Sequence, residues 1–249
     1  MSSSKNIVLE AKNISKYFGT ITALENVNLK VRQGECLGVV GDNGAGKSTF
    51  MKVLSGLYKP SGGSLFFDGN KETLNSPKDS QNLGLEMVYQ DLALAGNLPI
   101  GENIFLGREP TKNFGFLKLL DYKKIKELSE AHLDKLKIHV KSAEQKVEEL
   151  SGGQRQAIAI ARATAFNSKI VIMDEPTAAL AIKEVGKVLD LINSLKRMGV
   201  SVIIISHRMD DIFAVCDRVM ALFQGTNFAE SELSKTTRDE VIGWIMGKK

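Results

Sequence analysis

Three short segments carry side chains that could act together on a phosphorylated substrate. The segment Gly41 to Thr49 reads Gly-Asp-Asn-Gly-Ala-Gly-Lys-Ser-Thr, and the segment Ile170 to Glu175 is an apolar run that ends in two carboxylates. Between them lies Leu150 to Gln154, which reads Leu-Ser-Gly-Gly-Gln. A glycine-rich loop that ends in lysine and a hydroxyl residue is the pattern that cradles phosphates with backbone N–H groups. The chemistry indicated is phosphoryl transfer from a nucleotide.

The glycine-rich segment has the neighbours that a phosphate-binding loop requires. The apolar run Cys36 to Val40 predicts a buried strand directly before Gly41, and a helical pattern begins at Lys47 and stops at Gly56. We therefore expect the backbone amides from Gly44 to Thr49 to lie at a helix N-terminus, where the dipole favours anions. The alternative is a merely flexible glycine turn.

The acidic pair Asp174 and Glu175 would lie at the end of the strand Ile170 to Met173. Hydrolysis of a nucleotide needs a held metal ion and a water placed in line with the phosphoryl group. We assign Asp174 to the metal, together with the hydroxyl of Ser48, and Glu175 to the general base. A solvated turn is the alternative for two acids at a strand end, but Pro176-Thr177 and the upstream phosphate loop favour a functional site.

The segment Leu150 to Gln154 narrows the class of protein. In combination with the other two motifs it resembles the ABC ATPases, and the resemblance extends from Tyr17 to beyond His207. On residue types alone, Ser151 followed by Gln154 predicts a capping box at the start of a helix. Both interpretations can hold, because a capped helix N-terminus also attracts anions.

The resemblance implies ATP and Mg²⁺ as cofactors and gives roles to the remaining residues. Lys47, Glu175 and His207 are then the catalytic side chains, with His207 in contact with the γ-phosphate. Gln90 would touch Mg²⁺ or water, although a polar strand cap is the alternative. Tyr17 would stack on adenine, although a core tyrosine is the alternative. The expected sets are Tyr17, Gly41, Asn43, Gly44, Ala45, Gly46, Lys47, Ser48, Thr49 and Gln90 for ATP, Ser48, Gln90 and Asp174 for the metal, and Ser151, Gly152, Gly153 and Gln154 for the signature segment acting in trans.

The resemblance also implies a head-to-tail homodimer with ATP between the subunits. Ser151 and Gly153 of one subunit would close over the phosphate loop of the other. One residue departs from the family pattern: Ala181 stands where many relatives have an aspartate that helps to link the two sites. This departure puts the communication between the sites in doubt, but the base Glu175 is intact.

Two further strings, Tyr89 to Leu94 and Asn103 to Glu109, look like those of the bacterial importers of simple sugars. That likeness implies a membrane permease, an extracytoplasmic sugar-binding protein, and a peripheral location at the cytoplasmic face of the membrane. The segment Asp91 to Arg108 is expected to form the groove that receives a helix of the permease. The alternatives are an importer of another small solute, a soluble ABC ATPase without transport, and a non-hydrolysing regulator, which would be expected to lose Glu175 or His207.

Several elements must position these residues. Strands that alternate with helices predict an α/β fold with a mostly parallel sheet covered on both faces. The resemblance specifies a P-loop NTPase (RecA-like) core with an added antiparallel β part and an inserted helical subdomain. We expect a single ABC ATPase domain over residues 1–249, with the α/β core at about 1–90 and 166–249 and the helical subdomain at about 91–165. His132 and His139 fall in the helical part and are expected to lie in solvent.

Composition sets the remaining limits. The 249 residues are 43% hydrophobic and 25% charged, and the net charge of +4 is spread over scattered lysines, which predicts no nucleic-acid partner. The densest lysine cluster, Lys118 to Lys126, is expected on a solvated helix face. Cys36 and Cys216 form no metal pattern or disulfide framework, so reduced thiols are expected. No apolar stretch approaches the ~20 residues of a membrane-spanning helix. No secretory signal is expected, because residues Met1 to Asn6 lack the apolar stretch of one.

Overall fold

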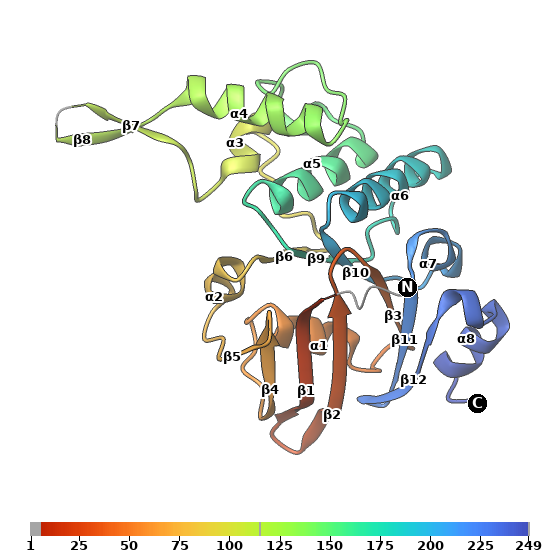
Figure 1. Ribbon diagram of the computed structural model, residues 1–249. Helices are drawn as coiled ribbons and strands as arrows, with labels where there is room; N and C mark the ends of the chain where they lie inside the picture. The colour runs from red at the N-terminus through yellow and green to blue at the C-terminus, as the bar shows by residue number, and fades with distance from the viewer. Residues whose placement is uncertain (1–5, 115, 249) are drawn as a thin grey trace.

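The computed structural model describes residues 6–114 and 116–248, in which two large β-sheets are surrounded by helices (Figure 1). The central sheet is parallel except for one edge strand, in the order β12-β11-β3-β10-β9-β6. Its strands are β3 (Cys36–Val40), β6 (Leu85–Val88), β9 (Ile170–Asp174), β10 (Ser201–Ile205), β11 (Arg218–Phe223) and β12 (Thr226–Glu232). The predicted mostly parallel α/β sheet is therefore confirmed.

The second sheet is antiparallel, in the order β2-β1-β4-β5. Its strands are β1 (Ile7–Phe18), β2 (Ile21–Arg32), β4 (Gly62–Phe67) and β5 (Asn70–Glu72). The antiparallel part was predicted. Bulges between Ala11 and Tyr17 bend β1 without ending its pairing with β2.

Helices cover both faces of the central sheet. Helix α1 (Lys47–Leu54) packs between the two sheets, where Phe50 and Met51 join one buried cluster with Leu37 of β3. The alternate residues of the same strands face a second cluster, which contains Val202 and Ile204. The helices around this second cluster are α6 (Ile182–Arg197), α7 (Met209–Val215) and α8 (Arg238–Ile245), while the short α2 (Pro77–Asn82) precedes β6.

The segment between β6 and β9 contains α3 (Ile100–Phe105), α4 (Tyr122–Lys135) and α5 (Gly152–Thr164), with a short 3₁₀ turn at Val147–Glu149. It shares the second cluster with the core helices, through residues such as Ile104 and Ile158. Among the described residues, no helix combines the length and apolar character needed to cross a bilayer.

Two expectations for this helical part were wrong. The cluster Lys118 to Lys126 does not lie on one helix face, because Lys118 belongs to a hairpin of β7 (Thr111–Phe114) and β8 (Leu117–Leu120) that precedes α4. His132 is not free in solvent: its Nε2 lies 2.9 Å from the carbonyl oxygen of Ala161, and burial lowers its pKa. Helical periodicity predicts neither the hairpin nor the hydrogen bond of His132, because it does not show which residues pack against a helix.

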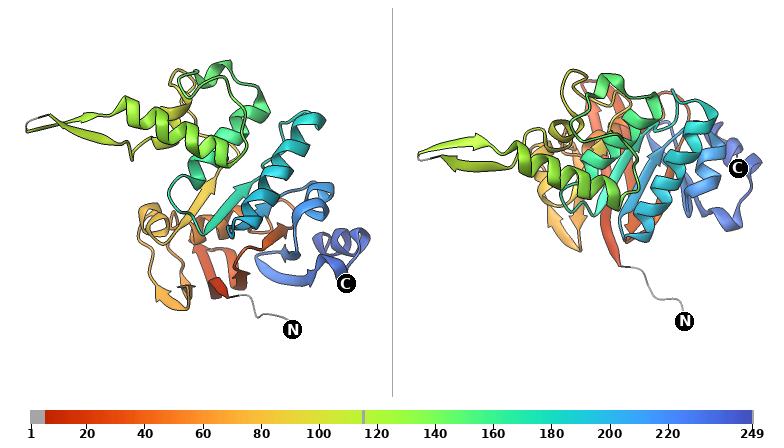
Figure 2. Two further views of the ribbon diagram at one scale, coloured as in Figure 1. Left: turned by 45° about the horizontal axis from the view of Figure 1, so that its top comes forward. Right: turned by 90° about the horizontal axis from the view of Figure 1, so that it is seen from above.

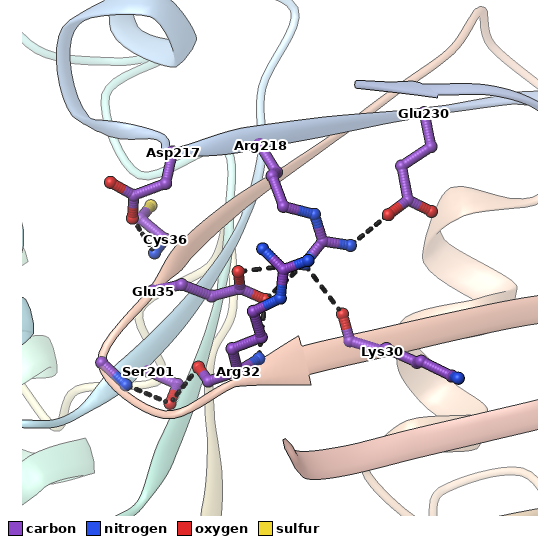
Figure 3. A network of polar contacts seen from close by, with 9 residues as sticks. Lys30, Arg32, Glu35, Cys36, Ser201, Asp217, Arg218 and Glu230 are labelled. Carbon is purple, nitrogen blue, oxygen red and sulfur yellow. Dashed lines mark hydrogen bonds and ion pairs between the residues drawn. The ribbon is translucent and has the colours of Figure 1, made fainter. Parts of the chain in front are cut away.

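A polar network fastens the antiparallel sheet to the central sheet (Figure 3). The Arg218 guanidinium of β11 donates to both carboxylate oxygens of Glu35, at 2.7 and 2.9 Å, and to the carbonyl of Lys30 at the end of β2. Arg218 also pairs with Glu230 of β12. Arg218 and Glu35 are both buried, so the charges of this ion pair are shielded from solvent.

The two cysteines, far apart in sequence, meet beside this network. Their Sγ atoms lie 3.5 Å apart, and both thiols are free. Burial raises the pKa of the Cys36 thiol, so it is held in its protonated form.

Candidate active site

The phosphate loop connects β3 to α1, and glycines form its turns. Gly41, Gly44 and Gly46 have φ values of 153°, 83° and 97°, a region that glycine adopts without strain. A Cβ on Gly41 would lie 2.4 Å from the carbonyl oxygen of Leu222, and one on Gly46 would lie 2.8 Å from that of Ala23. Around Gly44, none of the described residues beyond its chain neighbours comes within 4 Å of the Cβ position. The loop is therefore packed on one side and open on the other.

Lys47 is the first residue of α1, and its side chain turns back over the loop. Its ammonium donates to the carbonyl oxygens of Gly41 at 2.7 Å and Asp42 at 2.9 Å. Burial lowers the pKa of Lys47, and the negative charge of Glu175 acts in the opposite direction. Gly46, the N-cap residue of α1, gives the helix no side-chain cap, so its first amides remain available to an anion.

The two carboxylates occupy different backbone environments. Asp174 is the last residue of β9, whereas Glu175 follows with a φ of 49°, in the left-handed region that residues other than glycine rarely adopt. The Glu175 amide donates to the carbonyl oxygen of Ile205 at 2.9 Å, which holds the turn against the end of β10. Burial raises the pKa of both carboxyls, against the lowering effect of the positive charges of Lys47 and His207.

His207 reaches Glu175 because β10 and β9 are parallel neighbours, with Ile205 opposite Asp174. The His207 backbone amide donates to Glu175 Oε1 at 3.0 Å, and its Nε2 lies 3.4 Å from the same oxygen. The predicted base and the predicted γ-phosphate contact are therefore in direct contact with each other.

A buried contact behind this pair was not predicted. The Thr177 hydroxyl donates to the carboxylate of Asp211, and Arg208 Nε lies 3.5 Å from the same carboxylate. This contact joins the turn after Glu175 to the start of α7. Acids after His207 are typical of a helix's first turn, but only the fold places Thr177 opposite Asp211.

These segments enclose a cavity of about 380 Å³ at the carboxyl ends of β3, β9 and β10. Ala45 is buried beneath it, and Gly41 packs against β11, so these two predicted residues do not line it. The predicted residues that do line the cavity are Asn43, Gly44, Gly46, Lys47, Ser48, Thr49, Gln90, Asp174, Glu175 and His207.

Tyr17 lies at the edge of this arrangement. It pairs in register with Thr22 of β2, and Thr22 lines the cavity whereas Tyr17 does not. Tyr17 is 47% exposed, so the alternative of a core tyrosine was wrong. Its stacking on adenine stays a prediction.

The donors in the cavity fit the expected cofactors. The Ser48 hydroxyl, the Gln90 amide oxygen and the Asp174 carboxylate are oxygen ligands, which Mg²⁺ prefers. The open side of the loop, the Lys47 ammonium and the uncapped start of α1 suit the phosphates of a nucleotide.

The signature segment lies elsewhere. Ser151 is the N-cap of α5: its hydroxyl accepts from the Gln154 amide at 3.2 Å, and the Gln154 side chain accepts from the Ser151 amide at 3.1 Å. The predicted capping box is thus confirmed. Ser151, Gly153 and Gln154 line a separate cavity of about 490 Å³ between α5 and α6, not the cavity that contains Lys47.

The side chain of Glu184, in the first turn of α6, covers the start of α5. The Ser151 hydroxyl lowers the pKa of its carboxyl most, and the amides of Gly153 and Ala181 lower it further. Ala181 itself gives α6 no side-chain cap. Sequence reasoning missed Glu184, although its place three residues after Ala181 is that of the acid in a capping box.

The expected docking segment, Asp91 to Arg108, divides between core and surface. Ile104 and Phe105 are largely buried in the second cluster. Leu106 is 48% exposed and, with Arg108, lines a groove of about 310 Å³ beside β6 and α5. In this groove Arg108 donates to Glu86 of β6 at 2.7 Å.

Buried Asn103, not predicted to have a role, holds the chain that leads from Gln90 into α3. Its side-chain oxygen accepts from the Ala95 amide at 2.8 Å, and its amide nitrogen donates to the carbonyls of Ala95, Leu98 and Pro99. One side chain thus replaces the backbone hydrogen bonds that this irregular segment lacks.

Comparison with known proteins agrees with this arrangement. Residues 24–178 match the family model described as "ABC transporter". The chain is 45% identical, over 94% of its length, to the xylose/arabinose import ATP-binding protein of Sulfolobus acidocaldarius, and covers 92% of that protein. It is 39% identical to the ribose import ATP-binding protein of Caldanaerobacter subterraneus but spans only 48% of it. It likewise spans about half of the other bacterial relatives compared with it.

Solved structures support the same assignment. An ATP-binding cassette of an ABC transporter, crystallised in its ADP conformation, superposes with a TM-score of 0.82 at 28% identity and covers 96% of this chain and 95% of its own. A dimeric cassette bound to ADP and phosphate in a post-hydrolysis state superposes with a TM-score of 0.74 at 28% identity, over 90% of this chain and 98% of its own. With the phosphate loop, the acidic strand end and the capped signature helix in place, the chain belongs to the ABC transporter family as an ATP-binding cassette.

Proposed function

We propose that two copies of this chain hydrolyse ATP to drive the import of a monosaccharide through a membrane permease. The observation that carries the proposal is the cavity in which Lys47, Asp174 and Glu175 meet, with Glu175 held by the His207 amide at 3.0 Å. Five separate segments of the chain build this cavity, which is more than a solvated turn would need.

The roles of the residues follow from their positions. Mg²⁺-bound ATP supplies the phosphoryl group, and Ser48, Gln90 and Asp174 are the oxygen ligands that would hold the metal. Lys47 exchanges its contacts with the Gly41 and Asp42 carbonyls for phosphate oxygens.

Glu175 accepts a proton from the attacking water. Burial raises its pKa above the ordinary value of glutamate, which makes it a stronger base than an exposed glutamate. His207 lies beside it, with its Nε2 3.4 Å from the Glu175 carboxylate, and would contact the terminal phosphate.

The separate signature cavity supports a site shared between two copies. Ser151 and Gly153 do not reach the cavity that contains Lys47 in one chain, yet they are donors at a helix N-terminus, where a phosphate is favoured. Head-to-tail pairing would bring these donors to the partner's nucleotide and exclude water from Glu175.

Two observations support the permease and the sugar: the names of the relatives and one surface of this chain. Relatives that are 38–45% identical are named as import ATP-binding proteins for xylose/arabinose or for ribose. The groove of Leu106 and Arg108, next to the chain that follows Gln90, suits a helix of a membrane partner at the cytoplasmic face. An extracytoplasmic sugar-binding protein would then deliver the solute. A soluble ABC ATPase that takes no part in transport would not need such a groove.

Sugar uptake tests the proposal. In a strain of the source organism that lacks the gene, uptake of radiolabelled xylose, arabinose and ribose would be measured, with an amino acid as the unrelated solute. We expect loss of uptake for at least one sugar, recovery with the wild-type gene, and no recovery with Glu175→Gln. Unchanged uptake of every sugar tested, together with loss of another solute, would contradict the monosaccharide assignment while leaving the ATPase in place.

A further inference from the structure

The β7–β8 hairpin projects from the helical part, away from the rest of the molecule in all three views (Figures 1 and 2). Its strands form a sheet of their own, with Phe114 opposite Leu117 and Lys112 opposite Leu119. A single two-stranded hairpin is only marginally stable in water. A surface that covers it would stabilise it.

The apolar side chains of the hairpin are exposed and lie together. Residues paired across two antiparallel strands share a face, so Phe114, Leu117 and Leu119 lie on one face, 70%, 50% and 44% exposed. Phe116, in the turn, is 98% exposed. Lys112 lies on the same face, paired with Leu119, and the opposite face carries Thr111, Asn113, Lys118 and Leu120. Clustered exposed apolar side chains of this kind mark an interaction site.

Charge distinguishes between the surfaces that could cover this face. No acidic residue occurs between positions 110 and 120, whereas Lys112 and Lys118 are exposed, and exposed Lys123 and Lys124 begin α4. The cytoplasmic leaflet of a membrane is anionic and attracts such lysines. The cytoplasmic loops of a permease are themselves rich in Lys and Arg, and a second copy of the hairpin has the same charge. Charge complementarity therefore favours lipid.

We propose that the β7–β8 hairpin binds the surface of an anionic bilayer, with Phe114, Phe116 and Leu117 entering the interfacial region and the lysines among the phosphate headgroups. This goes beyond the proposed function and rests on it in one respect, since a permease would bring the hairpin to a membrane. The test needs neither permease nor ATP, so its failure would leave the ATPase assignment untouched.

Vesicle flotation of the full chain tests the proposal directly. Vesicles of phosphatidylcholine alone are compared with vesicles of equal parts phosphatidylcholine and phosphatidylglycerol. We expect binding to the anionic vesicles at low salt, with loss at high salt and little binding to phosphatidylcholine. Wild-type chain that stays with the aqueous fraction under all these conditions would overturn the proposal.

Variants separate the apolar and the charged contributions. Phe116→Ser/Leu117→Ser should weaken binding by about tenfold or more, and Lys112→Glu/Lys118→Glu should weaken it at least as much. Ile182→Ser is the matched control, because Ile182 is 87% exposed on another part of the molecule, and its binding should equal that of wild type. Equal loss in the control, or none in the hairpin variants, would show that the hairpin is not the lipid contact.

A fluorescent reporter at the tip adds a second readout. Phe116→Trp in a Trp244→Phe background leaves one tryptophan in the sequence, at the tip of the hairpin. We expect its emission to shift to shorter wavelength when anionic vesicles are added. An unshifted emission spectrum, with hairpin variants that instead fail to assemble with the permease, would assign the surface to protein and overturn the lipid proposal.

Discussion

Gly153 lies directly beneath the side chain of Glu184. A Cβ on this glycine would be 2.8 Å from the Glu184 Cβ and 3.0 Å from its carboxyl carbon, closer than packed atoms allow. The contact joins the start of α5 to the first turn of α6 and explains why glycine occupies a helical position that alanine would otherwise favour by ~1 kcal/mol.

We expect Gly153→Ala to have opposite effects on stability in two backgrounds. In the wild type it should lower the free energy of unfolding, by about 1 kcal/mol, because Glu184 must move. In Glu184→Ala, where the obstacle is gone, the same change should raise it by a similar amount through helix propensity. Thermal unfolding of the four proteins gives this double-mutant cycle. If Gly153→Ala changed the free energy of unfolding in the same direction in both backgrounds, the contact with Glu184 would not be the reason for glycine at this position.

Removing the base tests the assignment of Glu175. Glu175→Gln should retain ATP binding while turnover falls by ~10²-fold or more, the range that loss of a general base allows. Phosphate release measures turnover, and calorimetry measures binding. Glu127→Gln, an exposed glutamate of α4, is the matched control and should keep full activity. Turnover close to wild type in Glu175→Gln would remove the assignment.

The pH dependence of turnover follows from the same residue. Glu175 works as a base only when it is ionised, and burial raises its pKa above the ordinary 4.5 of glutamate. The rate at saturating ATP should therefore fall as the pH drops toward the raised pKa, at a higher pH than an exposed glutamate would give. The residual activity of Glu175→Gln should lack this acidic limb. An identical limb in both proteins would show that another group is titrating.

Mixing two inactive variants tests the shared site. Lys47→Ala should weaken ATP binding, and Ser151→Arg should block both pairing and turnover by placing a bulky cation at the start of α5. In a mixed dimer one composite site has both lesions and the other has neither, so turnover should rise above that of either variant alone. Light scattering that shows a fully active monomer, with a rate per subunit independent of protein concentration, would refute the shared site.

The docking groove can be tested without disturbing the nucleotide site. Leu106→Glu places a charge at a position that is 48% exposed and should abolish assembly with the permease and transport. Basal ATP turnover of the isolated chain should stay unchanged. Leu57→Glu, a leucine of similar exposure just after α1, is the control for added charge. Normal transport by Leu106→Glu would exclude this side chain from the contact.

The parts of the site that could be predicted from the sequence are those whose residues form contiguous motifs near the ends of strands. Asp174 ends a buried strand, Lys47, Glu175 and His207 come after one, and the carboxyl ends of parallel strands lie at one edge of the sheet. The capping box at Ser151 was readable because both of its partners lie within four residues.

The parts that could not be predicted depend on pairs distant in sequence. Thr177 meets Asp211 across 34 positions, and the Cys36 and Cys216 thiols across 180. Nothing local to either residue reveals such a partner. The β7–β8 hairpin was missed for another reason: Leu117 to Leu120 carries apolar residues on both faces, so the alternation typical of a strand is weak.

The network around Arg218 fastens the end of β2 to β3 and β11 through Glu35. The nucleotide cavity takes one wall from Thr22 and Ala23 of β2 and its floor from the loop after β3. Wall and floor are therefore expected to move as one rigid body. We therefore expect the cavity to open and close by movement of its opposite side, where Gln90 leads into the helical part. The hinge of this cassette is expected near residues 90 and 166, at the two ends of the insertion, and not between the two sheets.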